Sequence, residues 1–194
     1  MNDLTIRYYD KNAEKFYADT INADMSKCRD RFLKWIKQGK KILDAGCGSG
    51  RDVLAFLEAG YEVEAFDASL EMCRIASEIT GIHVRCLRFE DLTGQEQYDG
   101  IWACASLLHV KQEDLPDVLI RLYRLLKKDG FLYASFKYGE GERLKEDRYF
   151  HDLTEDTCRE LMETAGLTII EVFITHDVRN GRERDRWLNV IAQK

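Results

Sequence analysis

The chain has 194 residues, of which 45 % are hydrophobic and 33 % charged, and its formal net charge at pH 7 is −6. This length and composition are typical of one soluble globular domain, and the negative charge disfavours a nonspecific nucleic-acid binder. No apolar run is long enough to cross a membrane, and the first residues lack the layout of a secretory signal. The six cysteines form no Cys-x-x-Cys pair and no cluster with histidine. We therefore expect reduced thiols in a cytoplasmic protein, with no disulfide and no metal site.

Residues 1–38 are predicted to form a helical cap on a core of residues 39–194, all within a single domain. Aromatic side chains recur at helical spacing along this cap, at Tyr8, Tyr9, Phe16 and Tyr17. Such a stripe either covers a binding pocket as a lid or packs as ordinary core, and the pattern alone does not separate the two.

The next hundred residues alternate between strand and helix patterns. Strands are expected at 41–45, 61–66, 83–89, 100–106 and 131–136. Helices are expected between them at 51–59, 69–80 and 116–128. Ser69 is a good N-cap, and Pro116 suits the first turn of a helix. Alternation of this kind predicts a parallel sheet covered by helices on both faces.

The last third of the chain departs from that alternation. Residues 137–152 are predicted to form a polar loop, and a helix is expected at 154–166. Two strand runs follow at 168–175 and 186–192, joined by Asn180-Gly181, and Asn-Gly between strand runs is a strong hairpin signal. We therefore expect an antiparallel hairpin at the end of the sheet.

The first strand leads into a glycine-rich loop, Gly46-Cys47-Gly48-Ser49-Gly50. Glycines let the backbone approach a ligand and adopt positive φ, as in the cofactor loops of doubly wound α/β folds. The dinucleotide fingerprint G-x-G-x-x-G fails here, because Arg51 stands at the third glycine position. Asp44, just ahead of the loop, would repel a pyrophosphate. A cofactor with an α-ammonium and a positive sulfonium fits this loop better.

Four motifs together resemble those of the class I S-adenosylmethionine-dependent methyltransferases, in the small form that includes the bacterial tellurite-resistance group. They are the loop Asp44–Gly50, Asp67 at the end of the second strand, the segment Arg88–Leu92, and the strand Tyr98–His109. The resemblance implies a Rossmann-like α/β fold with a seven-stranded, mostly parallel sheet of order 3-2-1-4-5-7-6. The last strand would be antiparallel, a helical cap would precede the sheet, and S-adenosyl-L-methionine would be the cofactor.

The resemblance also assigns roles to single residues. Asp44 faces the cofactor's ammonium, and the glycine loop wraps its homocysteine part and ribose edge. Asp67 accepts the ribose hydroxyls, although without the glycine loop before it an N-cap role for the next helix would be equally expected. Asp91 takes the adenine amino group, and Glu90 is an adjacent rival for that role. The implied cofactor-binding residues are Asp44, Gly46, Cys47, Gly48, Gly50, Asp67, Ala68, Glu90, Asp91, Leu92, Cys104 and Ser106.

The catalytic and acceptor-binding residues are less visible in the sequence. Methyl transfer from a sulfonium leaves a neutral thioether, so much of the catalysis can be positioning, and a base is needed only when the nucleophile must lose a proton. His109, just beyond the fourth strand, is the candidate base, with a packing role as the alternative. The arginines of the late loops suggest an anion site, with a solvated hairpin tip as the alternative. The candidate acceptor-binding residues are Tyr8, Tyr17, Tyr138, Arg143, Arg148 and Arg186.

Several acceptor classes are disfavoured by missing motifs. The chain has no Asn/Asp-Pro-Pro-aromatic motif, no Pro-Cys pair and no appended RNA-binding module. We therefore predict a methyltransferase, monomeric or dimeric, that acts on a small metabolite, and the arginines favour an anionic one. No membrane or nucleic-acid partner is expected. The alternatives are a tRNA or protein methyltransferase that recruits its acceptor through the arginine-bearing hairpin, and a noncatalytic cofactor-binding or partner-activating subunit.

Overall fold

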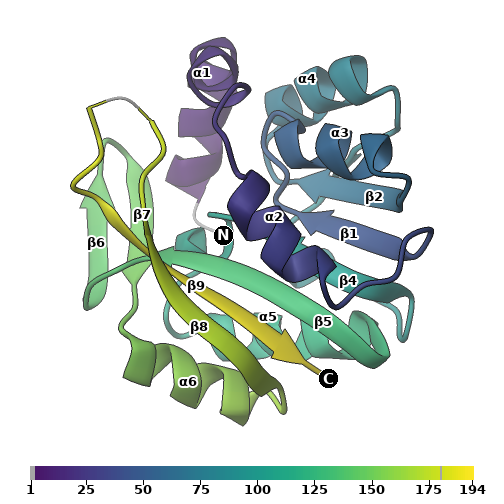
Figure 1. Ribbon diagram of the computed structural model, residues 1–194. Helices are drawn as coiled ribbons and strands as arrows, with labels where there is room; N and C mark the ends of the chain where they lie inside the picture. The colour runs from purple at the N-terminus through teal and green to yellow at the C-terminus, as the bar shows by residue number, and fades with distance from the viewer. Residues whose placement is uncertain (1–2, 180) are drawn as a thin grey trace.

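A twisted seven-stranded sheet runs through the centre of the computed structural model, which describes residues 3–179 and 181–194 (Figure 1). Its strand order is β3-β2-β1-β4-β5-β9-β8. β9 pairs antiparallel with β5 and β8, and the remaining pairs are parallel. Because β8 and β9 are the sixth and seventh strands of the predicted sheet, the expected order and the Rossmann-like α/β fold are confirmed. The strands are β1 (Lys41–Ala45), β2 (Glu62–Asp67), β3 (Arg85–Cys86), β4 (Tyr98–Ala103), β5 (Leu126–Lys137), β8 (Thr168–His176) and β9 (Arg186–Gln193).

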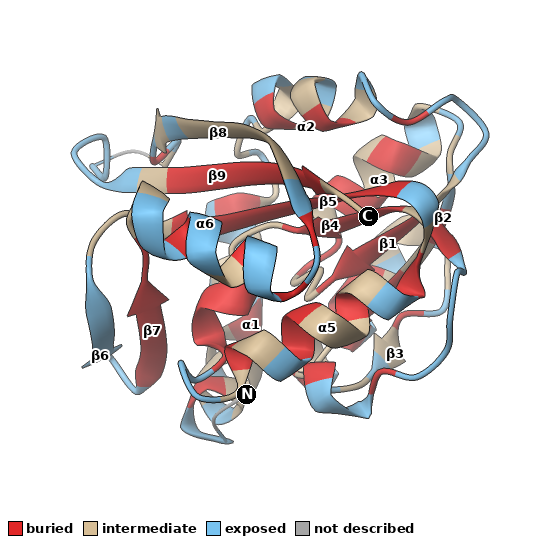
Figure 2. Ribbon diagram, turned by 90° about the horizontal axis from the view of Figure 1, so that it is seen from below, coloured by how far each residue is buried: buried red, intermediate tan, exposed pale blue. Residues whose placement is uncertain are grey.

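Helices cover both faces of the sheet. One apolar core joins a sheet face to α5 and α6, and a second joins the opposite face to α2, α3 and α4. The central strands are consequently buried on both sides, as their continuous apolar sequences require (Figure 2). Within the described residues, no helix is both long and apolar enough to span a membrane. The helices are α1 (Asp3–Thr20), α2 (Ser26–Leu33), α3 (Arg51–Glu58), α4 (Leu70–Thr80), α5 (Leu115–Leu125) and α6 (Glu155–Thr164), with short 3-10 turns at Phe89–Asp91 and Leu107–His109.

The predicted helix starts are confirmed by their capping contacts. Ser69 Oγ accepts a hydrogen bond from the backbone N–H of Met72 at 3.2 Å and caps α4. Thr154 caps α6 in the same way, and Pro116 lies in the first turn of α5. The first turn of a helix leaves backbone N–H groups unpaired. Ser69 and Thr154 each accept a hydrogen bond from one of these groups, and Pro116 has no N–H to pair.

Several predicted boundaries were wrong. The helix expected to run to Lys128 ends at Leu125, because Leu126 already pairs with Tyr98 as the first residue of β5. The strand expected to begin at residue 131 therefore begins at Leu126, and Asp129 lies inside it with a φ of 62° where the register shifts. β3 has only two residues instead of the predicted 83–89, and β4 ends at Ala103 instead of residue 106.

The prediction of a polar loop at 137–152 was also wrong. This segment contains an antiparallel hairpin of β6 (Gly141–Lys145) and β7 (Arg148–Asp152). β6 is exposed along its whole length, whereas β7 is buried (Figure 2). β7 is buried because it packs against α1 and the 3-10 turn Leu107–His109. The hairpin therefore forms a wall beside the carboxyl end of β4.

Candidate active site

A cavity of about 770 Å³ lies at the carboxyl ends of β1, β2, β4 and β5. This is the end of an open α/β sheet where ligands bind, and the volume is in the range of ligand pockets. α1, β7 and the loop between β8 and β9 complete its walls. The cavity thus brings together segments from both ends of the chain.

The glycine loop lies against the bottom of this cavity with its backbone in the left-handed region. Gly46 and Gly48 have φ values of 79° and 55°. A Cβ atom added to Gly46 would stand 2.5 Å from Ser106 Cβ, so no other residue fits there without displacing the end of β4. Gly46 and Gly48 line the cavity, as does Cys47, whereas Gly50 lies against α4 at Ala76.

Asp44 has a buried carboxylate oxygen, Oδ2, without a hydrogen-bond partner among the described residues. Its side chain lines the cavity. Burial raises the pKa of the Asp44 carboxyl well above its ordinary value, and the negative charge of Asp52 adds to that rise. A cation placed against Asp44 would satisfy the oxygen and favour its charged form. An α-ammonium group meets both requirements.

Asp67 holds the glycine loop and lines the cavity beside it. Its Oδ2 accepts the backbone N–H of Gly48 at 2.9 Å, and its Oδ1 accepts that of Ser69 at 2.9 Å. Ser69, and not Asp67, is the N-cap of α4. The alternative role of Asp67 as an N-cap was therefore wrong. Burial raises the pKa of Asp67, while hydrogen bonds from Ser69 and Gly48 act in the opposite direction. Each carboxylate oxygen keeps a lone pair for a ligand hydroxyl.

The segment after β3 does not line the cavity. Asp91 Oδ2 accepts the backbone N–H of Arg88 at 3.0 Å and so closes the 3-10 turn. Leu92 is buried in the core under α5. Ala68, Glu90, Asp91 and Leu92 all lie outside the lining. Their assignment to the cofactor stays a prediction from the resemblance.

The turn that follows β4 is strained where it meets the cavity. Ala105 has a φ of 53°, which is uncommon for a residue with a Cβ atom, and its N–H donates to Ser135 Oγ at 2.8 Å. Ser106 Oγ donates to the carbonyl of Ala45 at 2.6 Å. Cys104, Ala105 and Ser106 all line the cavity. Strained backbone of this kind is concentrated at functional sites.

His109 is buried at the cavity wall, with both ring nitrogens engaged. Nδ1 lies 2.7 Å from the carbonyl oxygen of Tyr149 in β7, and Nε2 lies 2.9 Å from the hydroxyl of Tyr9 in α1. Burial lowers the pKa of His109 to about 4, so the ring is neutral near pH 7. His109 therefore links α1 and β7 to the 3-10 turn Leu107–His109 that follows β4.

α1 presents Tyr9 and Phe16 to the cavity rather than the predicted Tyr8 and Tyr17. Tyr8 instead stacks under the guanidinium of Arg148, 4.4 Å from the ring centroid. Only three residues of α1 are buried, Thr5, Ala13 and Thr20. Ile6, Tyr9, Phe16 and Thr20 are the residues of α1 that line the cavity.

We expect hydrogen exchange of residues 3–22 to slow when S-adenosylhomocysteine binds. Tyr9 and Phe16 of α1 line the cavity, so a bound ligand would add contacts to a helix that otherwise packs on α4 and β7. The measurement compares free and ligand-bound protein by mass spectrometry. α5, which lies in the apolar core, is the internal control and should be unchanged. Equal exchange of residues 3–22 in both states would identify them as ordinary core.

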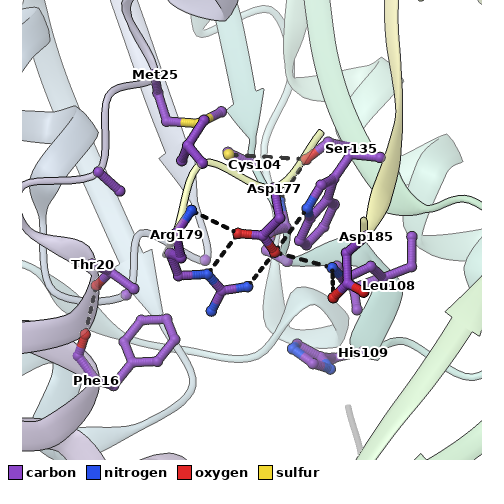
Figure 3. A pocket seen from close by; sticks show the side chains of 18 of the residues that line it. Phe16, Thr20, Met25, Cys104, Leu108, His109, Ser135, Asp177, Arg179 and Asp185 are labelled. Atoms are coloured by element: carbon purple, nitrogen blue, oxygen red, sulfur yellow. Dashed lines mark hydrogen bonds and ion pairs between the residues drawn. The ribbon is translucent and has the colours of Figure 1, made fainter. Parts of the chain in front are cut away.

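A cluster of charges joins the β8–β9 loop to the end of β5. The buried carboxylate of Asp177 accepts hydrogen bonds from Arg179 (Figure 3). It also accepts hydrogen bonds from Lys137 Nζ at 3.1 Å and from Trp187 Nε1 at 3.1 Å. Lys137 also pairs with Asp185 at 3.0 Å. Although burial alone would raise the pKa of Asp177, these partners lower it. The cluster fixes the loop over the cavity.

The predicted acceptor arginines all line the cavity, but they have different partners. Arg143 binds Asp152 through two hydrogen bonds of 2.6 and 3.0 Å, and Arg148 pairs with Glu146 at 2.8 Å. Arg186 stacks on the ring of Tyr138 at 4.1 Å. Within residues 3–179 and 181–194, no carboxylate forms an ion pair with Arg186, Arg182 or Arg184.

Several lining residues were missed by the sequence analysis. Asp52 accepts hydrogen bonds from Arg29 at 2.6 Å and Arg51 at 2.6 Å, and from Trp102 Nε1 at 3.0 Å. Of these, Arg51 and Asp52 line the cavity. The position of Arg51 directly after the glycine loop was the one signal in the sequence that could have identified it. Nothing in the sequence links Asp177 to Lys137, which are 40 residues apart.

The chain matches known methyltransferases in sequence and fold. Residues 42–130 match the profile of a methyltransferase domain family. An uncharacterized methyltransferase of Staphylococcus carnosus is 28 % identical over 170 residues, covering 80 % of each chain. The putative methyltransferase YqeM of Bacillus subtilis is 30 % identical over 177 residues, covering 81 % of this chain and 70 % of the relative.

A solved structure extends the likeness to nearly the whole chain. The Burkholderia thailandensis 1,6-didemethyltoxoflavin-N1-methyltransferase, with bound 1,6-didemethyltoxoflavin and S-adenosylhomocysteine, superposes with a TM-score of 0.80. Its sequence identity is 23 %, and the match covers 98 % of this chain and 87 % of that one. The chain thus belongs to the class I S-adenosylmethionine-dependent methyltransferases, and S-adenosyl-L-methionine is its cofactor.

Proposed function

We propose that this methyltransferase acts on a small anionic metabolite bound in the cavity beside the β6–β7 hairpin and the β8–β9 loop. One observation carries the proposal. The lining contributed by residues 135–189, named here the cationic wall, holds eight lysines and arginines but only three aspartates, although the chain as a whole has a net charge of −6. The eight are Lys137, Arg143, Lys145, Arg148, Arg179, Arg182, Arg184 and Arg186.

The three aspartates do not neutralise the cationic wall. Asp152 is occupied by Arg143, Asp177 by Lys137 and Arg179, and Asp185 by Lys137. Within the described residues, Arg182, Arg184 and Arg186 have no carboxylate partner, and a planar guanidinium suits carboxylate or phosphate. An anionic acceptor would complete this charge balance.

The cofactor supplies a methyl group on a positive sulfonium and leaves as a neutral thioether. The chain's part is to bind both partners in one geometry and exclude water, which is worth several kcal/mol in effective molarity. Asp44 and Asp67 would hold the ammonium and ribose ends of the cofactor. The cationic wall would hold the acceptor on the opposite side, beside Ala105 and Ser106.

A small acceptor is favoured over a macromolecule because α1 and the β6–β7 hairpin form walls of the cavity. The Burkholderia enzyme, which binds 1,6-didemethyltoxoflavin, supports a small acceptor for this chain as well. The test uses methyl-tritiated S-adenosylmethionine with separated fractions of a cell extract. Label in low-mass products that an anion exchanger retains supports the proposal. Label only in RNA or protein would support a macromolecular acceptor instead, and label in no fraction would support a noncatalytic role.

Arg186→Ala is expected to lower kcat/KM for the acceptor about tenfold, because an exposed charge contact of about 1.4 kcal/mol is lost. Arg143→Ala should lower it less, since Asp152 already occupies that guanidinium. Cofactor affinity should stay within about twofold in both variants. Steady-state kinetics with the acceptor from the extract screen provide the measurement. Arg159→Ala, on the exposed side of α6, is the control. If Arg186→Ala and Arg143→Ala both keep the wild-type kcat/KM, these arginines do not bind the acceptor and belong to a solvated hairpin surface.

A further inference from the structure

The hydrogen bonds around His109 fix where its protons lie. The Tyr149 carbonyl oxygen, 2.7 Å from Nδ1, can only accept a hydrogen bond, so Nδ1 carries the proton. In the neutral ring Nε2 is then a bare acceptor. The Tyr9 hydroxyl, 2.9 Å from Nε2, must therefore donate its hydrogen to the ring.

This arrangement leaves the Tyr9 oxygen only lone pairs to offer a ligand, and the positive charge of Arg148 also acts on that oxygen. A hydroxyl has one hydrogen to donate and two lone pairs to accept with, and the hydrogen of Tyr9 is already committed to His109. Both side chains line the cavity, as do Ala105 and Ser106 at the end of β4. A ligand atom that contacts Tyr9 Oη must therefore bring a hydrogen of its own.

The position of Tyr9 is fixed on both sides by neighbouring contacts of α1. Thr5 Oγ1 accepts the backbone N–H of Tyr149 at 3.0 Å. Asp10 Oδ1 accepts the hydroxyl of Ser69 at 2.6 Å. α1 is thus attached to β7 just before Tyr9 and to the start of α4 just after it. The hydroxyl is held in place rather than carried on a free segment.

We propose that Tyr9 Oη is a catalytic group that accepts a hydrogen bond from the acceptor atom to be methylated, and that this atom accordingly bears an O–H or N–H. The inference rests on the proposed function, because it requires a methyl acceptor in this cavity. His109 is a positioning residue that orients the Tyr9 hydroxyl and receives its proton.

The proton transfers balance without another reactant. As the acceptor atom forms its bond to the methyl carbon, the electron pair of the broken carbon–sulfur bond stays on the cofactor's sulfur. The acceptor's proton moves to Tyr9 Oη, and the Tyr9 proton moves to His109 Nε2. Burial and the positive charges of Arg148 and Arg143 keep the pKa of His109 low, at about 4, so the imidazolium returns its proton to water.

The experiment compares the wild type with Tyr9→Phe, using methyl-tritiated S-adenosylmethionine and the low-mass fraction of a cell extract as probes. Tyr9→Phe removes only the hydroxyl and keeps the ring, which makes edge contacts with Tyr8 and Phe16. Tyr123→Phe, on α5, is the matched control. Affinity for S-adenosylhomocysteine verifies the fold and should stay within about twofold in both variants.

We expect Tyr9→Phe to lower kcat about a hundredfold, the lower end of general acid–base effects, and to abolish the solvent deuterium isotope effect on kcat. Mass spectrometry of the labelled product should locate the methyl group on an oxygen or nitrogen that carried hydrogen in the acceptor. Wild-type kcat in Tyr9→Phe overturns the inference, as does a quaternary ammonium or sulfonium product. Absence of transfer by the wild type to any low-mass compound is a separate outcome, which overturns the proposed function itself.

Discussion

Asp67→Ala is expected to weaken binding of S-adenosylmethionine and S-adenosylhomocysteine about ten- to a hundredfold. The substitution removes the carboxylate proposed to accept the ribose hydroxyls, and losing a charged hydrogen-bond partner costs about 1.5–3 kcal/mol. It also leaves the backbone N–H of Gly48 without its 2.9 Å acceptor, so the glycine loop loses a restraint. Isothermal calorimetry with both ligands measures the effect directly.

Asp67→Asn separates the two contributions. The amide oxygen can still accept one backbone N–H, but only one acceptor atom remains in place of two. We therefore expect an affinity between those of the wild type and Asp67→Ala. Circular dichroism verifies that both variants are folded. An unchanged affinity in folded Asp67→Ala would contradict the assignment of Asp67 to the cofactor.

The fold could be predicted largely because each early strand ends at a strong local signal. The glycine loop, Asp67 and the Ser69 cap mark successive strand–helix transitions, and these were placed within a few residues. The end of α5 could not be placed, because Leu125-Leu126-Lys127-Lys128 continues a helical pattern. Pairing of Leu126 with Tyr98 in β4 overrides that local preference.

The sequence of the β6–β7 hairpin contains no pattern that predicts its two strands. β6 is exposed on both faces, so its residues show no alternation of apolar and polar side chains. β7 buries polar residues, among them Arg148, because it packs against α1 and the turn at His109, and only Phe150 of this strand joins the main apolar core. The connecting residues Glu146 and Asp147 both have positive φ without a glycine, so the usual sign of a tight hairpin turn is missing.

The site was predictable in its cofactor half and less so in its acceptor half. The glycine loop and both aspartates, Asp44 and Asp67, lie on continuous motifs whose geometry is set locally. Which tyrosines of α1 line the cavity depends on how the helix rotates against its neighbours, with a non-helical residue at Asn12. The partners of the arginines come from distant segments, as with Arg179 in the cluster centred on Asp177 and Lys137.

Asp52→Ala is expected to lower the free energy of unfolding by about 3–5 kcal/mol, the usual cost of removing one partner from a buried ion pair. The Asp52 carboxylate is buried, with 6 % of its side chain exposed, and two arginines and the Trp102 indole donate to it. Without it, Arg29 and Arg51 face each other uncompensated at the edge of the cavity. Urea denaturation monitored by tryptophan fluorescence provides the measurement.

The dependence on pH distinguishes this ion cluster from simple loss of packing. Burial alone would raise the pKa of Asp52, but the charges and hydrogen bonds of Arg51 and Arg29 lower it. Its stabilising contribution is therefore complete above the unfolded-state pKa of about 4 and is lost as the pH falls below it. The gap between wild type and Asp52→Ala should shrink in that acid range. Glu113→Ala, which breaks an exposed pair with Lys111, is the control and should change stability by no more than about 0.5 kcal/mol. If Asp52→Ala is as harmless as this control, the cluster around Asp52 does not stabilise the cavity wall.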